Sequence, residues 1–372
     1  MTEDERYRTS TQYRLWSYTP ASLAALRDTT NRIAADRVRE AVRRVRQSRA
    51  ASSTETSEAE GSRSVSGLPE GDVDCLTVEE ELKLLAFYCR QTLQLGDHLK
   101  VPTDVKATAI QYIKRFYVTN SLMTYHPTDI LKTALFFATK TENYYFRLTK
   151  FAEAIGKTKP EDVLASEFLL TQGLRFTFDV RHPFRALEGA VMELQAMDEG
   201  HIPWQGPKPE NMNKRIKDAH GVAREYLKTS AQLTDVYFHF TPSQIMFAAL
   251  AIADAELTES YIACKFPSTS PGAEELREKI MATISQCAET LATVEPDSQP
   301  SEQERAELKA LAKKLNKCRN PEKMDLVGLQ KAKREGGEGA GENRIAKKRK
   351  LETDQVMKDA DDLFGPAIKK ST

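Results

Sequence analysis

The sequence has few cysteines, and the pattern of those it has excludes two classes of protein. Its five cysteines are widely scattered and form no Cys-x-x-Cys pair: Cys75, Cys89, Cys264, Cys287 and Cys318. An odd number at wide spacing argues against a disulfide framework and against a cysteine-based zinc site. It fits a reducing compartment.

Excess charge and long apolar runs are also absent. The 54 basic and 54 acidic residues cancel, so no global field draws the chain to nucleic acid or membranes, and any electrostatic role must be local. The longest apolar run, Ile245 to Ala253, is far shorter than the roughly 20 residues needed to cross a bilayer. The first ten residues, MTEDERYRTS, have no apolar core, so we expect no signal peptide. These features predict a soluble, intracellular protein with no membrane partner.

Signatures of enzymes are missing as well. The six histidines show no metal-ligand spacing. Gly156-Lys157-Thr158 resembles the end of a phosphate-binding loop, but the first glycine of that motif would stand where the chain has Phe151. Neither a kinase signature nor a Gly-x-Ser-x-Gly elbow is present. We therefore predict a non-catalytic protein that holds no metal, no cofactor and no small-molecule ligand directly.

Two stretches have almost nothing to bury, and we predict that both are disordered. One is a linker at 48–72, rich in Ser, Thr, Glu and Gly, and the other is a tail at 321–372 that carries a basic cluster. The material that can fold is therefore an N-terminal segment, 1–47, and a body that follows residue 72.

The body is predicted to be helical throughout. Apolar residues recur at spacings of three and four, and no convincing strand alternation is found. Thr77 and Glu80 form a capping-box pattern in front of one such helix, and another opens after Pro102. A third, from Pro127, is apolar on nearly all sides, which is typical of a helix in the middle of a bundle. Two more are expected near Tyr144–Ile155 and from Pro160 to about Leu174.

The third of these helices recurs later in the chain. Residues 126–138 align with 241–253 at a constant offset of 115, with five matching pairs: Pro127/Pro242, Ile130/Ile245, Ala134/Ala249, Leu135/Leu250 and Ala138/Ala253. Thr241 and Gln244 form a second capping box. The repeat predicts two similar helical domains, each organised around one buried, alanine-rich helix.

Three separated segments resemble the cyclin family, in the form found in cyclins of the H type. The run from Tyr112 to Pro127, YIKRFYVTNSLMTYHP, is similar to the second-to-third helix region of a cyclin box. The segments Tyr13–Tyr18 (YRLWSY) and Leu233–Tyr237 (LTDVY) resemble other parts of the same proteins. The three lie in the right order, and the resemblance covers most of 12–318.

The resemblance implies an all-α fold and a regulatory function. The expected fold is two tandem five-helix cyclin boxes, at 73–180 and 181–290, with an extra N-terminal helix and an extra C-terminal helix at 291–320. Cyclins bind and activate a cyclin-dependent kinase. In H-type cyclins this is the CDK-activating kinase, which phosphorylates the activation loops of other such kinases. Within the TFIIH transcription factor it phosphorylates the C-terminal repeats of RNA polymerase II, and a RING-finger assembly factor completes the kinase complex.

The resemblance also implies which residues bind the kinase. Cyclins carry a lysine at the end of the third helix and a glutamate in the fifth, which match Lys140 and Glu167, and Phe137, Thr141 and Glu142 belong to the same region. Most cyclins follow the lysine with a bulky apolar residue and two acids, whereas Thr141, Glu142 and Asn143 follow it here. The alternative interpretation of Lys140 is a cation at a helix C-terminus, and that of Glu167 is an exposed edge position.

Local basic segments leave a second function open. An amphipathic helix is predicted at 20–47, and seven arginines lie within residues 32–49. This basic face is either solvated on a docked helix, which we favour, or a contact for nucleic acid or an acidic partner. A second cluster predicts nuclear import and hence a nuclear protein: Arg344, Lys347, Lys348, Arg349 and Lys350. The rival to a kinase regulator is a cyclin-fold transcription adaptor that binds nucleic acid.

Overall fold

The computed structural model describes residues 3–53, 73–156, 158–267 and 272–318. Every regular element in these ranges is a helix, and none of the described residues lies in a strand. The all-α prediction is therefore confirmed for the described part of the chain.

The N-terminal segment forms three helices: α1 (Glu3–Thr9), α2 (Thr11–Trp16) and α3 (Pro20–Ser53). Ser10 caps α2, since the backbone N–H of Tyr13 donates to its hydroxyl over 3.2 Å. Thr19 does the same for α3 through the N–H of Ser22. The long helix α3 was predicted and runs past residue 47 to Ser53, whereas α1 and α2 were not predicted.

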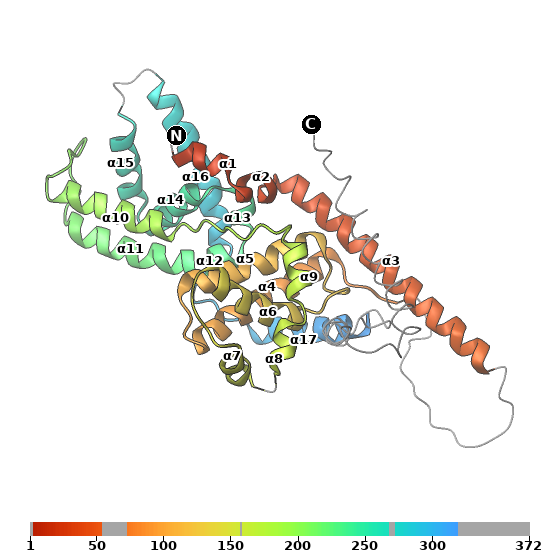
Figure 1. Ribbon diagram of the computed structural model, residues 1–372. Coiled ribbons are helices and arrows are strands. Elements are labelled where there is room, and N and C mark those ends of the chain that lie inside the picture. The colour runs from red at the N-terminus through yellow and green to blue at the C-terminus, as the bar shows by residue number, and fades with distance from the viewer. Residues whose placement is uncertain (1–2, 54–72, 157, 268–271, 319–372) are drawn as a thin grey trace, which may run out of the picture. The chain divides into compact units, whose positions relative to one another are not determined.

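The first repeat contains six helices, drawn in orange to yellow-green in Figure 1. They are α4 (Val78–His98), α5 (Thr103–Thr119), α6 (Pro127–Thr141), α7 (Leu148–Ile155), α8 (Pro160–Leu164) and α9 (Glu167–Gly173). The capping box of Thr77 and Glu80 is present at the start of α4. As the sequence predicted, α6 lies in the middle, packed against α4, α5, α8 and α9.

Two helices of the first repeat differ from the sequence-based prediction. The expected fifth helix is broken into α8 and α9, because the Thr133 hydroxyl on α6 donates to the Val163 carbonyl over 2.7 Å and the buried Ser166 leaves helical geometry. The expected fourth helix begins at Leu148 rather than near Tyr144. The chain first closes α6, with Asn143 at a φ of 55° and the Tyr144 N–H donating to the Thr139 carbonyl.

The second repeat has the same organisation around a second alanine-rich helix. It comprises α10 (Phe184–Asp198), α11 (Met212–Lys228), α12 (Ser230–Leu233), α13 (Val236–His239), α14 (Pro242–Ala253), α15 (Ala255–Lys265) and α16 (Ala273–Ala292). Helix α14 packs against α10, α11 and α16, and α10 and α11 lie side by side (Figure 1). Ala134 and Ala249, which the duplication pairs, are both completely buried.

A last helix, α17 (Glu302–Lys317), returns to the first repeat and packs on α4. Leu311 and Leu315 form its buried side. Lys314 donates to both carboxylate oxygens of Glu80, the residue that caps α4, at 3.1 and 2.9 Å. The predicted C-terminal helix is therefore part of the first repeat's packing.

Candidate functional site

Lys140 and Glu167, which the resemblance to cyclins implied, lie side by side on the first repeat. Lys140 is in the last turn of α6 and Glu167 is the first residue of α9. The Lys140 Nζ lies 2.7 and 2.9 Å from the two carboxylate oxygens of Glu167, and 5.0 Å from the centroid of the Phe136 ring. The side chains are 43% and 26% exposed, so a partner can reach both.

The helix ends explain why these two charges occupy these positions. A cation is favoured at the C-terminus of α6 and an anion at the N-terminus of α9, each by about 0.3–1 kcal/mol. The ion pair itself, at the surface, stabilises the fold by only about 0–1 kcal/mol. Because it contributes so little to folding, the pair is free to serve recognition.

Phe137 lies mostly below this surface. Its side chain is only 8% exposed, and its ring packs 5.8 Å from that of Tyr112 and 5.0 Å from that of Phe178. In this position Phe137 supports the C-terminal end of α6 and offers little area to a partner.

Thr141 and Glu142 are half-buried, and their side chains form hydrogen bonds with residues of α5 in the same repeat. The Tyr112 hydroxyl donates to the Phe178 carbonyl over 2.6 Å and lies 3.0 Å from Thr141 Oγ1. Glu142 accepts a hydrogen bond of 2.6 Å from Thr108. Burial raises the pKa of Glu142 above its ordinary value, although the Thr108 bond opposes the rise.

Glu142 is the end of a chain of hydrogen bonds that reaches the second repeat. His182 Nε2 lies 2.8 Å from the Thr108 hydroxyl, and His182 Nδ1 lies 2.9 Å from the Tyr237 hydroxyl. Gln232 Nε2 is 3.1 Å from the same Tyr237 oxygen. One assignment of the protons satisfies all of these hydrogen bonds. Gln232 donates to Tyr237, Tyr237 donates to His182 Nδ1, His182 Nε2–H donates to Thr108, and Thr108 donates to Glu142. Burial lowers the pKa of His182 to about 3, so the ring is neutral.

Three exposed aromatic residues that follow Lys140 or Glu167 in the sequence were missed by the sequence analysis: Tyr145, Phe168 and Phe176. Phe168 follows Glu167 directly and is 49% exposed. One signal could have identified it. Val163, Leu170 and Leu174 are spaced seven and four apart and are all buried, and Phe168 falls off that stripe. Aromatic residues are enriched at protein–protein interfaces relative to the rest of the surface.

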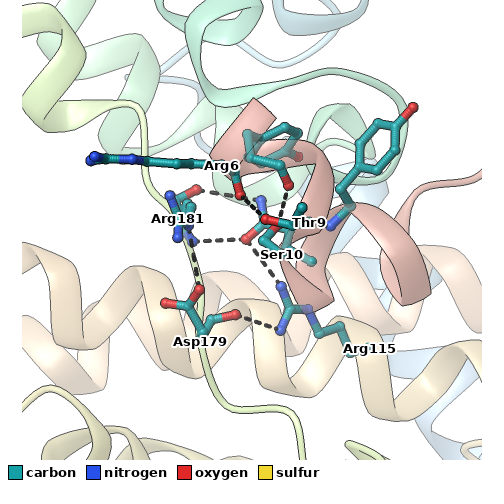
Figure 2. A network of polar contacts seen from close by, with 9 residues as sticks. Arg6, Thr9, Ser10, Arg115, Asp179 and Arg181 are labelled. Carbon is teal, nitrogen blue, oxygen red and sulfur yellow. Dashed lines mark hydrogen bonds and ion pairs between the residues drawn. The ribbon is translucent and has the colours of Figure 1, made fainter. Parts of the chain in front are cut away.

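The N-terminal helices pack on the segment that joins the two repeats (Figure 2). Gln12 Oε1 accepts from the Arg181 backbone N–H over 2.7 Å and from the buried Arg115 guanidinium over 3.3 Å. Arg115 also donates to the Asp179 carbonyl over 3.3 Å. Burial lowers the pKa of Arg115 to about 10, so its charge persists and these carbonyl and amide oxygens must solvate it.

Asp235 is a second connection between the N-terminal segment and the repeats. Arg27 on α3 donates to its two carboxylate oxygens over 2.7 and 2.9 Å. Lys114 on α5, 4% exposed, lies 3.7 Å from the same carboxylate and donates to the Thr234 carbonyl. Burial alone would raise the pKa of Asp235, but Arg27 and Lys114 outweigh it and hold the pKa at about 2.

Within the described ranges, no group of three or more His, Cys, Asp or Glu side chains could hold a metal ion. In the same ranges, every helix is too short or too polar to span a bilayer. The proposed import cluster, Arg344 to Lys350, lies outside the described residues.

Comparison with known proteins matches both repeats to one family. Residues 79–179 match the cyclin N-terminal domain and residues 182–292 match the cyclin C-terminal domain. Cyclin CCL1 of Saccharomyces cerevisiae is 34% identical over 278 residues, which are 74% of this chain and 65% of CCL1. Cyclin-H of Xenopus laevis is 28% identical over 80% of this chain and 87% of its own length.

Two solved structures are similar as well. A chain in the structure of the CAK complex from Chaetomium thermophilum bound to ATP-γ-S is 40% identical, with a TM-score of 0.75 over 92% of this chain and 97% of that one. A chain in the yeast TFIIK (Kin28/Ccl1/Tfb3) complex is 29% identical, with a TM-score of 0.56 over 77% of this chain and 100% of that one. The sequence-based resemblance is confirmed: this chain belongs to the cyclin family, and its relatives include cyclins of the H type.

Proposed function

We propose that the chain is the H-type cyclin of a CDK-activating kinase, a non-catalytic subunit that binds and activates a cyclin-dependent kinase. The observation that carries this proposal is the surface at the ends of α6 and α9. There Lys140 and Glu167 are held together at helix termini, and the exposed Phe168 follows Glu167 in the sequence. Similarity along nearly the whole chain to a protein in a CAK complex supports it.

The mechanism is conformational. The surface around Lys140 and Glu167 binds the kinase's mobile C-helix and activation loop in their active arrangement, which completes the kinase's own Lys–Glu ion pair and magnesium site. The cyclin supplies differential binding and no reacting group. To move a kinase from 1:99 to 99:1 in favour of the active form, it must bind that form about 10⁴-fold more tightly.

The remaining partners follow from the same relatives. The yeast complex that contains a similar chain also contains Kin28 and Tfb3, and we propose a kinase and a RING-finger assembly factor as the corresponding partners here. Attachment to the TFIIH core, and phosphorylation of kinase activation loops and of the RNA polymerase II C-terminal repeats, belong to the same proposal. Nuclear import would use the cluster Arg344, Lys347, Lys348, Arg349 and Lys350.

Nucleic-acid binding by α3 has less support. Arg27 faces inward to Asp235, and two further arginines of this helix pair with acids on it, Arg39 with Asp36 and Arg44 with Glu40. These pairs neutralise part of the basic face. A DNA-affinity measurement across a salt series would show a steep dependence if the remaining arginines bound phosphates.

The test of the proposed function is activation of a purified kinase of the Kin28 type. With this chain added, phosphorylation of a peptide from the RNA polymerase II C-terminal repeats should rise at least about tenfold, because a poorly populated active form becomes the major one. The chain alone should transfer no phosphate. If a saturating concentration of this protein leaves the activity of several kinases of this class unchanged, the proposal is refuted.

A further inference from the structure

The turn after α9 has an unusual backbone. Arg175 and Phe176 have φ angles of 52° and 53°, and in the described part of the chain they are the only consecutive non-glycine residues in the left-handed region. Such a conformation is unfavourable for a residue with a Cβ atom and persists only where the surroundings impose it. The Phe176 ring is nevertheless 64% exposed, so burial of this ring does not explain the strain.

Trp16 at the end of α2 contacts this turn at two residues, Arg175 and Thr177. Two guanidinium groups lie over its indole, which is 1% exposed: the Cζ atoms of Arg115 and Arg175 are 5.3 and 5.2 Å from the ring centroid. The indole Nε1–H donates to the Thr177 hydroxyl over 2.9 Å, and that hydroxyl donates to the Leu174 carbonyl over 2.7 Å.

These contacts fix the residues on either side of Phe176. Arg175 stacks on the indole face, and Thr177 accepts from the indole edge. The Phe176 backbone N–H donates to the Thr171 carbonyl on α9 over 3.0 Å. The Phe176 side chain therefore has little freedom except to point outward, at the end of α9 opposite to Glu167. The seven residues of α9 place Glu167 and the turn about 10 Å apart along the helix.

We infer that Trp16 is a positioning residue of the kinase-contact surface: it holds the turn of residues 174–177 and so presents the Phe176 ring to the kinase. The inference rests on the proposed function. An aromatic ring held exposed in a strained backbone conformation is preorganised, which lowers the entropy lost on binding. Trp16 itself is buried and acts through Arg175 and Thr177.

The simplest alternative is that Trp16 only packs the core. A double-mutant cycle distinguishes this packing role from the positioning role. Arg175 is exposed, so Arg175→Ala opens one face of the stack and leaves the core intact. We expect it to weaken affinity for a Kin28-type kinase about fivefold, while thermal stability falls by no more than about 4 °C. In a Phe176→Ala background the same substitution should change affinity by less than about twofold, because the residue that the stack presents is already gone.

Two further variants complete the design. Trp16→Phe keeps an aromatic ring beside the guanidinium groups but loses the donation to Thr177 and leaves a small cavity, so its affinity should fall between those of the wild type and Arg175→Ala. Arg8→Ala is the matched control, because Arg8 also stacks on an aromatic ring of the N-terminal segment, 5.7 Å from the Tyr13 centroid. It should leave kinase affinity unchanged.

Equal losses from Arg175→Ala with and without Phe176, or no loss at all, would overturn the role given to Trp16. Either result is distinguishable from failure of the proposed function. If the wild-type chain binds and activates the kinase and Glu167→Lys weakens binding, only the inference about Trp16 fails. If the wild-type chain does not bind the kinase, the proposed function fails.

Discussion

His182 connects the two repeats through hydrogen bonds that require a neutral ring. Nδ1 accepts from Tyr237 and Nε2 donates to Thr108, and both neighbours already have a second partner. A proton on Nδ1 would break this arrangement, and burial together with the Arg115 charge lowers the pKa of His182 to about 3. A histidine in an unfolded chain has a pKa of about 6.5.

This difference predicts a dependence of stability on pH. Between pH 6.5 and about 3 the unfolded chain binds a proton at His182 and the folded chain does not, so stability falls as the pH is lowered. From pH 7 to pH 5, urea unfolding should show that the wild type loses about 1–2 kcal/mol more than His182→Gln. Parallel losses in the two proteins would contradict a neutral His182.

Asp235 is ionised in the folded chain whereas His182 is neutral, yet both make the fold less stable as the pH falls. Its pKa of about 2 lies below the usual value near 3.9, so its ion pairs contribute stability above about pH 4 that is lost as the pH falls toward 2. Asp235→Asn should therefore destabilise the chain by about 1–2 kcal/mol at pH 7. The gap to the wild type should shrink between pH 5 and pH 3. A gap independent of pH in unfolding experiments would mean that Arg27 and Lys114 do not hold the carboxylate ionised.

At the scale of elements, α17 is attached to α4 mainly by apolar burial. Leu315 is completely buried, so Leu315→Ala should cost about 3 kcal/mol of unfolding free energy. The neighbouring exposed residue gives a control, Asn316→Ala, which should change stability little. Thermal or chemical unfolding measures both. Equal behaviour of the two variants would show that α17 does not pack on the body in solution.

The sequence predicted those elements whose signals are local. The capping boxes at Thr77 and Thr241 and the prolines at positions 127 and 242 mark helix starts that the structure confirms. The two alanine-rich helices were identified because no polar face interrupts them. Signals within each segment were sufficient in both cases.

Other features depend on tertiary contacts and could not be predicted. Helix α5 reads as amphipathic, yet Lys114 and Arg115 on its polar side are buried against the second repeat and the N-terminal segment. The break between α8 and α9 depends on a bond from Thr133 on another helix. Lys140 and Glu167 were placed at the site by resemblance, and only the fold reveals that they pair with each other.

At the scale of the whole folded unit, the N-terminal segment binds both repeats. Gln12 and Trp16 contact the residues that join the repeats, and Arg27 on α3 reaches Asp235 in the second repeat. Lys114 joins the first repeat to the same carboxylate. These contacts make the two cyclin domains one body, which a subunit needs in order to hold a kinase in one conformation.

The most direct test of the central claim is a charge swap at the candidate site. Reversing both members of the pair, with Lys140→Glu and Glu167→Lys together, restores an ion pair within the cyclin and inverts the charges that a partner meets. Thermal stability should fall by only a few degrees: the surface pair itself contributes little, and each reversed charge now opposes a helix end by about 0.3–1 kcal/mol. Affinity for a Kin28-type kinase, measured by calorimetry, should fall at least about 100-fold, since inverted charges repel where the originals attract. Wild-type affinity in the doubly reversed protein would show that this surface does not bind the kinase.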